Sequence, residues 1–130
     1  MFDSIAQTIA YQKLPLDASV SLSIKRLDQI HPQISGNKFF KLKYNFLEAQ
    51  KQGFDKVLTF GGAYSNHIAA TAYAAHLFSL KSVGIIRGEE LSNQVLNPTL
   101  STAQHFGMQL HFVSRQQYRQ KDQPEYQSEL

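Results

Sequence analysis

Cysteine and tryptophan are both absent from this chain of 130 residues. Without cysteine there is no disulfide framework, no thiolate nucleophile and no cysteine-ligated metal site, so the fold must be stabilised by packing. No apolar stretch is long enough to cross a bilayer, and residues 1–10 lack the basic and then apolar order of a secretory leader. These absences predict a cytoplasmic protein with no membrane partner.

A strong excess of one charge is also missing. Thirteen Lys and Arg residues stand against ten Asp and Glu residues, for a net charge of +3. The basic residues are spread along the chain except for a short cluster at Lys38, Lys41 and Lys43. Nucleic-acid binding normally needs a larger basic surface, so we expect no nucleic-acid partner, and the short cluster suits a small anion better.

The spacing of the histidines and the overall composition narrow the possible classes of protein further. The five histidines lack the spacing of zinc ligands; they are residues 31, 67, 76, 105 and 111. Hydrophobic residues make up 42% of the chain and charged residues 18%, which is typical of a folded globular protein. At this length we expect one compact unit.

Hydrophobic periodicity predicts strands and helices in alternation. The expected strands are residues 20–25, 57–60, 83–86 and 110–113. The expected helices are residues 38–52, 65–78 and 98–106, with Asn37, Ser65 and Asn97 as N-caps and Gly53 and Gly107 ending the first and third. Residues 1–19, with a turn signal at 17–19, are expected to be irregular, and residues 114–130 are a polar segment without a further apolar strand.

This order of elements predicts an α/β fold in three layers, a parallel sheet with helices on both faces. Ligands of such folds bind at the carboxyl ends of the strands. The strand expected at 20–25 has no obvious local partner, and no apolar strand follows residue 113. The sequence therefore predicts an incomplete sheet.

The first candidate site is the segment SGNKFFKL at residues 35–42. Lys38 and Lys41 are three residues apart, so both amines lie on one side of the predicted helix near its positive N-terminal end. A lysine amine is a nucleophile that condenses with carbonyl compounds, and a second cation nearby can neutralise an anion. The alternative is that both lysines only solvate an exposed helix face.

The second candidate site is the segment GGAYSNH at residues 61–67. Its glycine turn joins a strand to a helix and places Ser65, Asn66 and His67 at the helix N-terminus, where free amides can bind a carboxylate or phosphate. The alternative for Ser65 is a simple N-cap. Dinucleotide, P-loop and hydrolase-elbow glycine patterns are absent from the sequence.

Together the segment at 35–42 and the second segment, extended to TFGGAYSNH at 59–67, resemble the 1-aminocyclopropane-1-carboxylate deaminase and D-cysteine desulfhydrase family, of the tryptophan-synthase-β-like (fold type II) class of pyridoxal-phosphate (PLP) enzymes. The resemblance covers about residues 20–113. It implies PLP as cofactor and a small amino acid as substrate. Lys38 would hold the cofactor covalently and move a substrate proton, and Lys41 would neutralise the cofactor phosphate. Asn66 would hydrogen-bond the pyridine 3-oxygen; Ser65, Asn66 and His67 would hold the substrate carboxylate, with Ser65 also in proton transfer.

The chain departs from the family pattern in two respects. Phe40 stands where the family often has arginine, and the chain would be only the N-terminal half of a member. Residues 1–37 would then belong to the larger PLP domain, 38–113 would form the smaller domain, and 114–130 would be a truncated polar segment. The resemblance implies a homo-oligomeric full-length parent and an inactive fragment. His67 in place of glutamine favours D-cysteine as substrate.

Two other interpretations stay open. The chain could be a non-catalytic α/β module that binds a phosphorylated small molecule or a partner chain through the same helix N-termini. It could also be a fragment whose exposed sheet edge promotes self-association.

Overall fold

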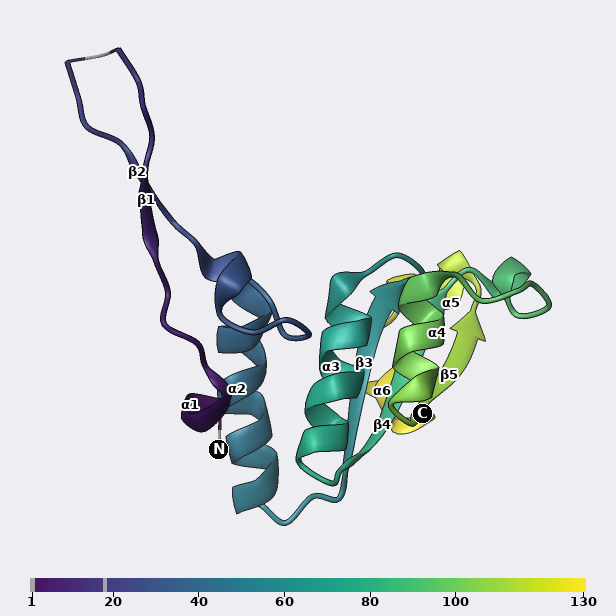
Figure 1. Ribbon diagram of the computed structural model, residues 1–130. Helices are drawn as coiled ribbons and strands as arrows, with labels where there is room; N and C mark the ends of the chain where they lie inside the picture. The colour runs from purple at the N-terminus through teal and green to yellow at the C-terminus, as the bar shows by residue number, and fades with distance from the viewer. Residues whose placement is uncertain (1, 18) are drawn as a thin grey trace.

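The central element of the computed structural model is a three-stranded parallel sheet. Its strands are β3 (Lys56–Gly62), β4 (Lys81–Arg87) and β5 (Met108–Val113), with β4 in the middle. Helices α3 (Asn66–Leu77) and α4 (Pro98–His105) connect them and lie side by side on one face (Figure 1). The structure describes residues 2–17 and 19–130, so Ala18 of the turn expected at 17–19 lies outside it.

Small side chains let α3 lie close to the sheet. The alanines of α3 that are buried are Ala70, Ala72, Ala74 and Ala75. Ile68 from α3, Leu100 from α4 and Ile86 from β4 form one core between the helices and the sheet. The expected N-cap of α4 is confirmed, because Asn97 Oδ1 accepts a hydrogen bond of 3.0 Å from the Leu100 amide.

The opposite face of the sheet is covered by the C-terminal segment. Helices α5 (Arg115–Arg119) and α6 (Pro124–Ser128) lie behind the sheet in Figure 1. The Tyr118 ring meets the Phe60 ring edge to face at 6.0 Å, and Ile85 on this face is only 2% exposed. Helices on both faces are therefore confirmed. Helices α5 and α6 could not be predicted in the polar segment 114–130, because helices this short show no hydrophobic period.

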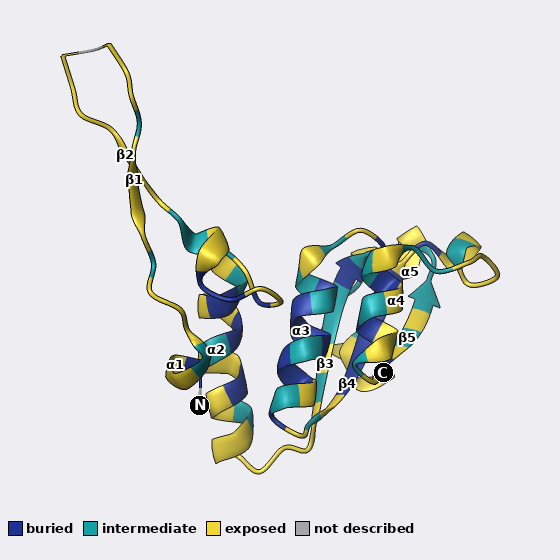
Figure 2. Ribbon diagram, viewed as in Figure 1, coloured by how far each residue is buried: buried dark blue, intermediate teal, exposed yellow. Residues whose placement is uncertain are grey.

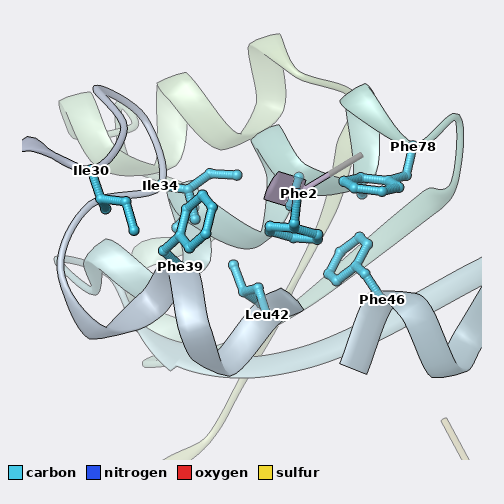
Figure 3. Packing of buried hydrophobic residues seen from close by; sticks show 10 residues of the cluster. Phe2, Ile30, Ile34, Phe39, Leu42, Phe46 and Phe78 are labelled. Carbon is cyan, nitrogen blue, oxygen red and sulfur yellow. The ribbon is translucent and has the colours of Figure 1, made fainter. Parts of the chain in front are cut away.

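A second core joins the N-terminal residues to the sheet domain. Helix α1 (Phe2–Ile5) lies against α2 (Asn37–Lys51), and the ring of Phe2 stacks on Phe78 at 4.8 Å (Figure 3). Phe39, Leu42 and Phe46 of α2 are buried in the same cluster. These three residues recur at steps of three and four, so they share one face of the helix, and their burial fixes α2 beside α3.

The expectation for residues 1–25 is wrong in three respects. The segment 1–19, expected to be irregular, contains helix α1 and the first strand of a hairpin. Strand β1 (Tyr11–Lys13) pairs antiparallel with β2 (Ser23–Lys25), so the predicted strand is shorter and has a local partner. Its alternation predicted one buried face, but Val20, Leu22 and Ile24 are 67%, 49% and 44% exposed. The hairpin extends away from the body and is exposed along its strands (Figure 2) because no described element packs on it.

Three details correct or complete the predicted elements. Gly36, with φ of 63°, is the N-cap of α2, and Asn37 is already helical. The strand expected to be fully buried at 57–60 is an edge strand in which Leu58 stays exposed. Two 3-10 turns, η1 (Leu27–Gln29) and η2 (Glu89–Leu91), lie in loops. Among residues 2–17 and 19–130, no helix is both long and apolar enough to cross a membrane.

Candidate functional site

Lys38 lies in the first turn of α2, where the core residues around it fix its direction. The side chain is half-buried, and its Nζ donates a hydrogen bond of 2.9 Å to Asn37 Oδ1. The adjacent Phe39 is buried against Phe2, so rotation of the helix about its axis would expose a phenylalanine. The amine is therefore held on the side of α2 that faces α3.

The loop before α2 is organised by His31. Its Nδ1 accepts hydrogen bonds of 3.1 Å from the amides of Gln33 and Ile34, and the side chain is only 7% exposed. The Gly36 amide closes the loop by donating to the Leu27 carbonyl at 2.9 Å. An imidazole nitrogen that accepts two amide bonds carries no proton, so this loop requires Nδ1 to be deprotonated.

His31 makes the stability of the chain depend on pH. Burial lowers the pKa of His31 below its ordinary value of 6.5. As pH falls below 6.5, the unfolded chain takes up the proton before the folded chain does, so the free energy of unfolding must fall. We expect urea unfolding to give a lower stability at pH 5 than at pH 7. The variant His31→Asn, which keeps an acceptor but cannot titrate, should show a smaller pH dependence; identical pH profiles would contradict this role.

The turn after β3, at Ala63 and Tyr64, places the start of α3. Gly61 and Gly62, predicted to belong to this turn, are instead the last two residues of the strand. The Ser65 amide donates to the Gly62 carbonyl at 3.0 Å, and Asn97 Nδ2 donates to the Ala63 carbonyl at 3.0 Å. Ser65 is the N-cap of α3, as predicted, but its side chain makes no capping hydrogen bond. The turn is thus anchored both to its own strand and to α4.

Lys38 and Asn66 line the same hollow, of about 320 Å³, between α2, α3 and α4. Ser35, Pro98 and Thr102 form other parts of its wall. The lysine of the first predicted site and the asparagine of the second, 28 positions apart in the sequence, therefore face one space. An amine and an amide group that converge on one hollow can bind a polar, anionic small molecule.

Lys41 and His67 line a neighbouring hollow of about 460 Å³ between α2, β3 and α3. Thr59 Oγ1 lies 2.9 Å from His67 Nε2, a hydrogen bond whose direction depends on the imidazole tautomer. Ser65 lines neither of the two hollows. The structure thus divides the predicted residues into two adjacent pairs, Lys38 with Asn66 and Lys41 with His67.

His67 links the two hollows electrostatically. Its pKa is lowered first by burial and then by the positive charges of Lys38 and Lys41. Both lysines therefore act on the same imidazole, although they line different hollows. A lowered pKa keeps the ring neutral at neutral pH, so His67 can both donate and accept a hydrogen bond.

Two residues of this region were not predicted from the sequence. Thr59 is part of the predicted strand and of the segment that resembles the family, but no role was expected of its side chain, which hydrogen-bonds the His67 ring. Asn37 was expected as a helix cap, yet it accepts from the Lys38 amine. Thr59 could have been found, because it lies two residues before Gly61 and so points to the same face of β3 as that glycine.

The side chains fit a PLP cofactor better than they fit a metal ion. An amine, a second cation and a side-chain amide match the aldehyde, phosphate and ring oxygen of that cofactor. Lys38, Lys41 and Asn66 supply these groups from two adjacent hollows. Within the described part of the chain, no cluster of three or more His, Asp or Glu residues could hold a metal ion.

Curated relatives were found by sequence comparison, although no family model matches. A Thermotoga maritima protein, named as a candidate 1-aminocyclopropane-1-carboxylate deaminase, is 38% identical over 103 residues. The mitochondrial bifunctional D-cysteine desulfhydrase/1-aminocyclopropane-1-carboxylate deaminase of Arabidopsis thaliana is 36% identical over 106 residues. Each match covers 79% of this chain but only 32% and 26% of those relatives, so the chain spans a third or less of their lengths.

Solved structures agree with the sequence comparison. A crystal structure described as an ACC deaminase homologue, where ACC abbreviates 1-aminocyclopropane-1-carboxylate, is 29% identical to this chain and has a TM-score of 0.71. The match covers 84% of this chain and 33% of the homologue's chain. A hydrogen sulfide-producing enzyme of Fusobacterium nucleatum shares the fold at a TM-score of 0.66, with 13% identity over 99% of this chain and 42% of its own. The chain is therefore a relative, in sequence and in fold, of the 1-aminocyclopropane-1-carboxylate deaminase and D-cysteine desulfhydrase family of fold type II PLP enzymes.

Proposed function

We propose that this chain supplies the lysine-bearing part of a PLP-dependent deaminase or desulfhydrase that acts on a small amino acid. The observation that carries the proposal is the convergence of Lys38 and Asn66 on one hollow, beside Lys41 and His67. These pairs bring the two sequence segments of the family together. The substrate is D-cysteine or 1-aminocyclopropane-1-carboxylate, and His67 favours D-cysteine.

Each residue has a role that its chemistry allows. Lys38 would hold the cofactor covalently and then move the proton at the α-carbon of D-cysteine, or at an equivalent carbon of 1-aminocyclopropane-1-carboxylate, whose α-carbon carries no hydrogen. Lys41 offsets the phosphate charge and Asn66 donates to the ring oxygen. Ser65, Asn66 and His67 hold the substrate carboxylate with the amides at the start of α3, and Ser65 assists proton transfer. When bound, the cofactor withdraws electrons from the substrate α-carbon.

Catalysis requires polypeptide beyond this chain. The relatives are three to four times longer than the segment matched here, so the proposed division is a larger-domain segment at 1–37, a smaller domain at 38–113 and a polar segment at 114–130. We infer that the 130-residue chain alone releases no sulfide from D-cysteine, and that the complete enzyme is a homo-oligomer. Sulfide release by the isolated chain would contradict the first inference.

The cofactor role of Lys38 is tested by borohydride reduction of the chain with an equimolar amount of PLP, followed by peptide mapping. We expect the label on Lys38 to exceed that on other lysines, because Lys41 and Asn66 retain the cofactor beside it. Lys38→Ala should lose this label, and Lys41→Gln should need more PLP to reach it.

A matched control is Lys56→Ala, which removes an exposed lysine at the start of β3 and should leave the label on Lys38 unchanged. Equal labelling of Lys38 and Lys56 in the wild-type chain would remove Lys38 from the cofactor role. Reversible PLP binding without a reducible adduct would instead support the non-catalytic α/β module.

A further inference from the structure

A second hollow with a different charge pattern lies at the carboxyl ends of β3 and β4. It has a volume of about 620 Å³, and Arg87, Arg115 and Arg119 line it together with Tyr118 and Glu90. None of the residues that line the Lys38 hollow or the Lys41 hollow belongs to it. Three of the four arginines of the chain therefore meet in one place, outside the proposed cofactor site.

Two of these guanidinium groups are held in position by neighbours. Arg87, the last residue of β4, lies over the Tyr118 ring at 5.7 Å, and a Cβ atom added at Gly62 would lie 3.8 Å from its Nη2. Arg115 Nη2 forms an ion pair of 3.0 Å with Glu90 Oε1. Tyr118 is itself fixed against Phe60, so the floor of the hollow rests on the sheet.

Arg119 differs from the other two. It ends α5, its side chain is exposed, and no ion pair or hydrogen bond of its guanidinium is found among the described residues. Glu90 is the only acidic residue in the lining, so the hollow carries three positive charges against one negative charge. The net charge of +2 matches that of a phosphate monoester dianion at neutral pH.

We propose that this arginine hollow binds the phosphate group of a small phosphorylated molecule. Guanidinium groups bind phosphate through paired N–H donors, and the carboxyl ends of parallel strands are where α/β folds bind ligands. The volume is that of a small-molecule site, whereas nucleic acid would need a basic surface that continues beyond the hollow. The hollow shares Gly62, Ala63 and Tyr64 with the segment at 61–67, but Lys38, Lys41, Asn66 and His67 do not line it.

Binding of inorganic phosphate to the 130-residue chain, measured by calorimetry at constant ionic strength, tests the proposal. We expect saturable binding, and we expect Arg119→Gln to raise the dissociation constant roughly five- to tenfold through loss of one charge-assisted contact. Arg115→Gln should weaken binding as well. Glycerol phosphate in a parallel titration should bind at least as tightly as inorganic phosphate, because the open hollow leaves room for an ester group.

Two variants distinguish this site from the alternatives. Arg26→Gln removes an arginine that pairs with Asp28 elsewhere on the surface, and it should bind phosphate as the wild type does. Lys41→Gln should keep the binding that depends on Arg119. The proposal is overturned if phosphate binding is not saturable, if Arg119→Gln binds as tightly as the wild type, or if Lys41→Gln alone abolishes binding.

Discussion

Replacing Phe46 with alanine is expected to lower the free energy of unfolding by about 3–5 kcal/mol. The Phe46 side chain is buried between α1, α2 and α3, with its ring 5.6 Å from Phe78 and 6.2 Å from Phe2. Truncation removes these contacts and leaves a cavity that the surrounding rings can only partly fill. Since domains are stable by about 5–15 kcal/mol, the variant should be close to unfolding at room temperature.

Urea unfolding followed by circular dichroism measures this loss. Tyr44→Ala is the matched control, because Tyr44 is an exposed aromatic residue on the same helix and its truncation should change stability by no more than about 0.5 kcal/mol. Phe46→Leu provides a milder change if the alanine variant fails to fold, and it should lie between alanine and wild type. Equal stabilities for Phe46→Leu and wild type would contradict the packing role.

The second large effect is expected at Gly61, where β3 passes beneath the first turn of α3. A Cβ atom at this position would lie 2.5 Å from Cγ1 of Ile68 and 2.7 Å from its Cδ1. Ile68 is fully buried and cannot move aside, so α3 or β3 must shift. We expect Gly61→Ala to cost about 1–3 kcal/mol, after allowing for the small gain from a less flexible unfolded chain.

Gly84→Ala is the comparison for this prediction. Its Cβ would approach Met108 Sδ at 2.8 Å, but a methionine side chain is flexible and can adopt another rotamer. Both variants add one methyl group between the sheet and its helices, and thermal unfolding should show the larger loss for Gly61→Ala. Similar losses of stability in the two variants would mean that the clash with Ile68 is not the cause of the destabilisation by Gly61→Ala.

Several structural features could be predicted because they depend on neighbours in the sequence. The stripe of Phe39, Leu42 and Phe46 follows the helical period, and Asn97 before Pro98 marks a helix start. The alternation of strands and helices then restricts the sheet to a parallel one. This reasoning fails for the hairpin of β1 and β2. Its apolar residues alternate as in a half-buried strand, but that face is buried only where another element packs on it.

In the candidate site, too, some features follow from the sequence and others depend on tertiary packing. The sequence alone placed the candidate residues in two groups, since Lys38 and Lys41 are about one helical turn apart and Asn66 and His67 closely follow two glycines. Only the tertiary structure decided that Lys38 shares a hollow with Asn66 and Lys41 shares one with His67, because the cluster around Phe2 sets the rotation of α2 against α3. The arginine hollow likewise combines residues from β4 and α5, whose proximity depends on the packing of Tyr118 on the sheet, a contact that no local sequence pattern encodes.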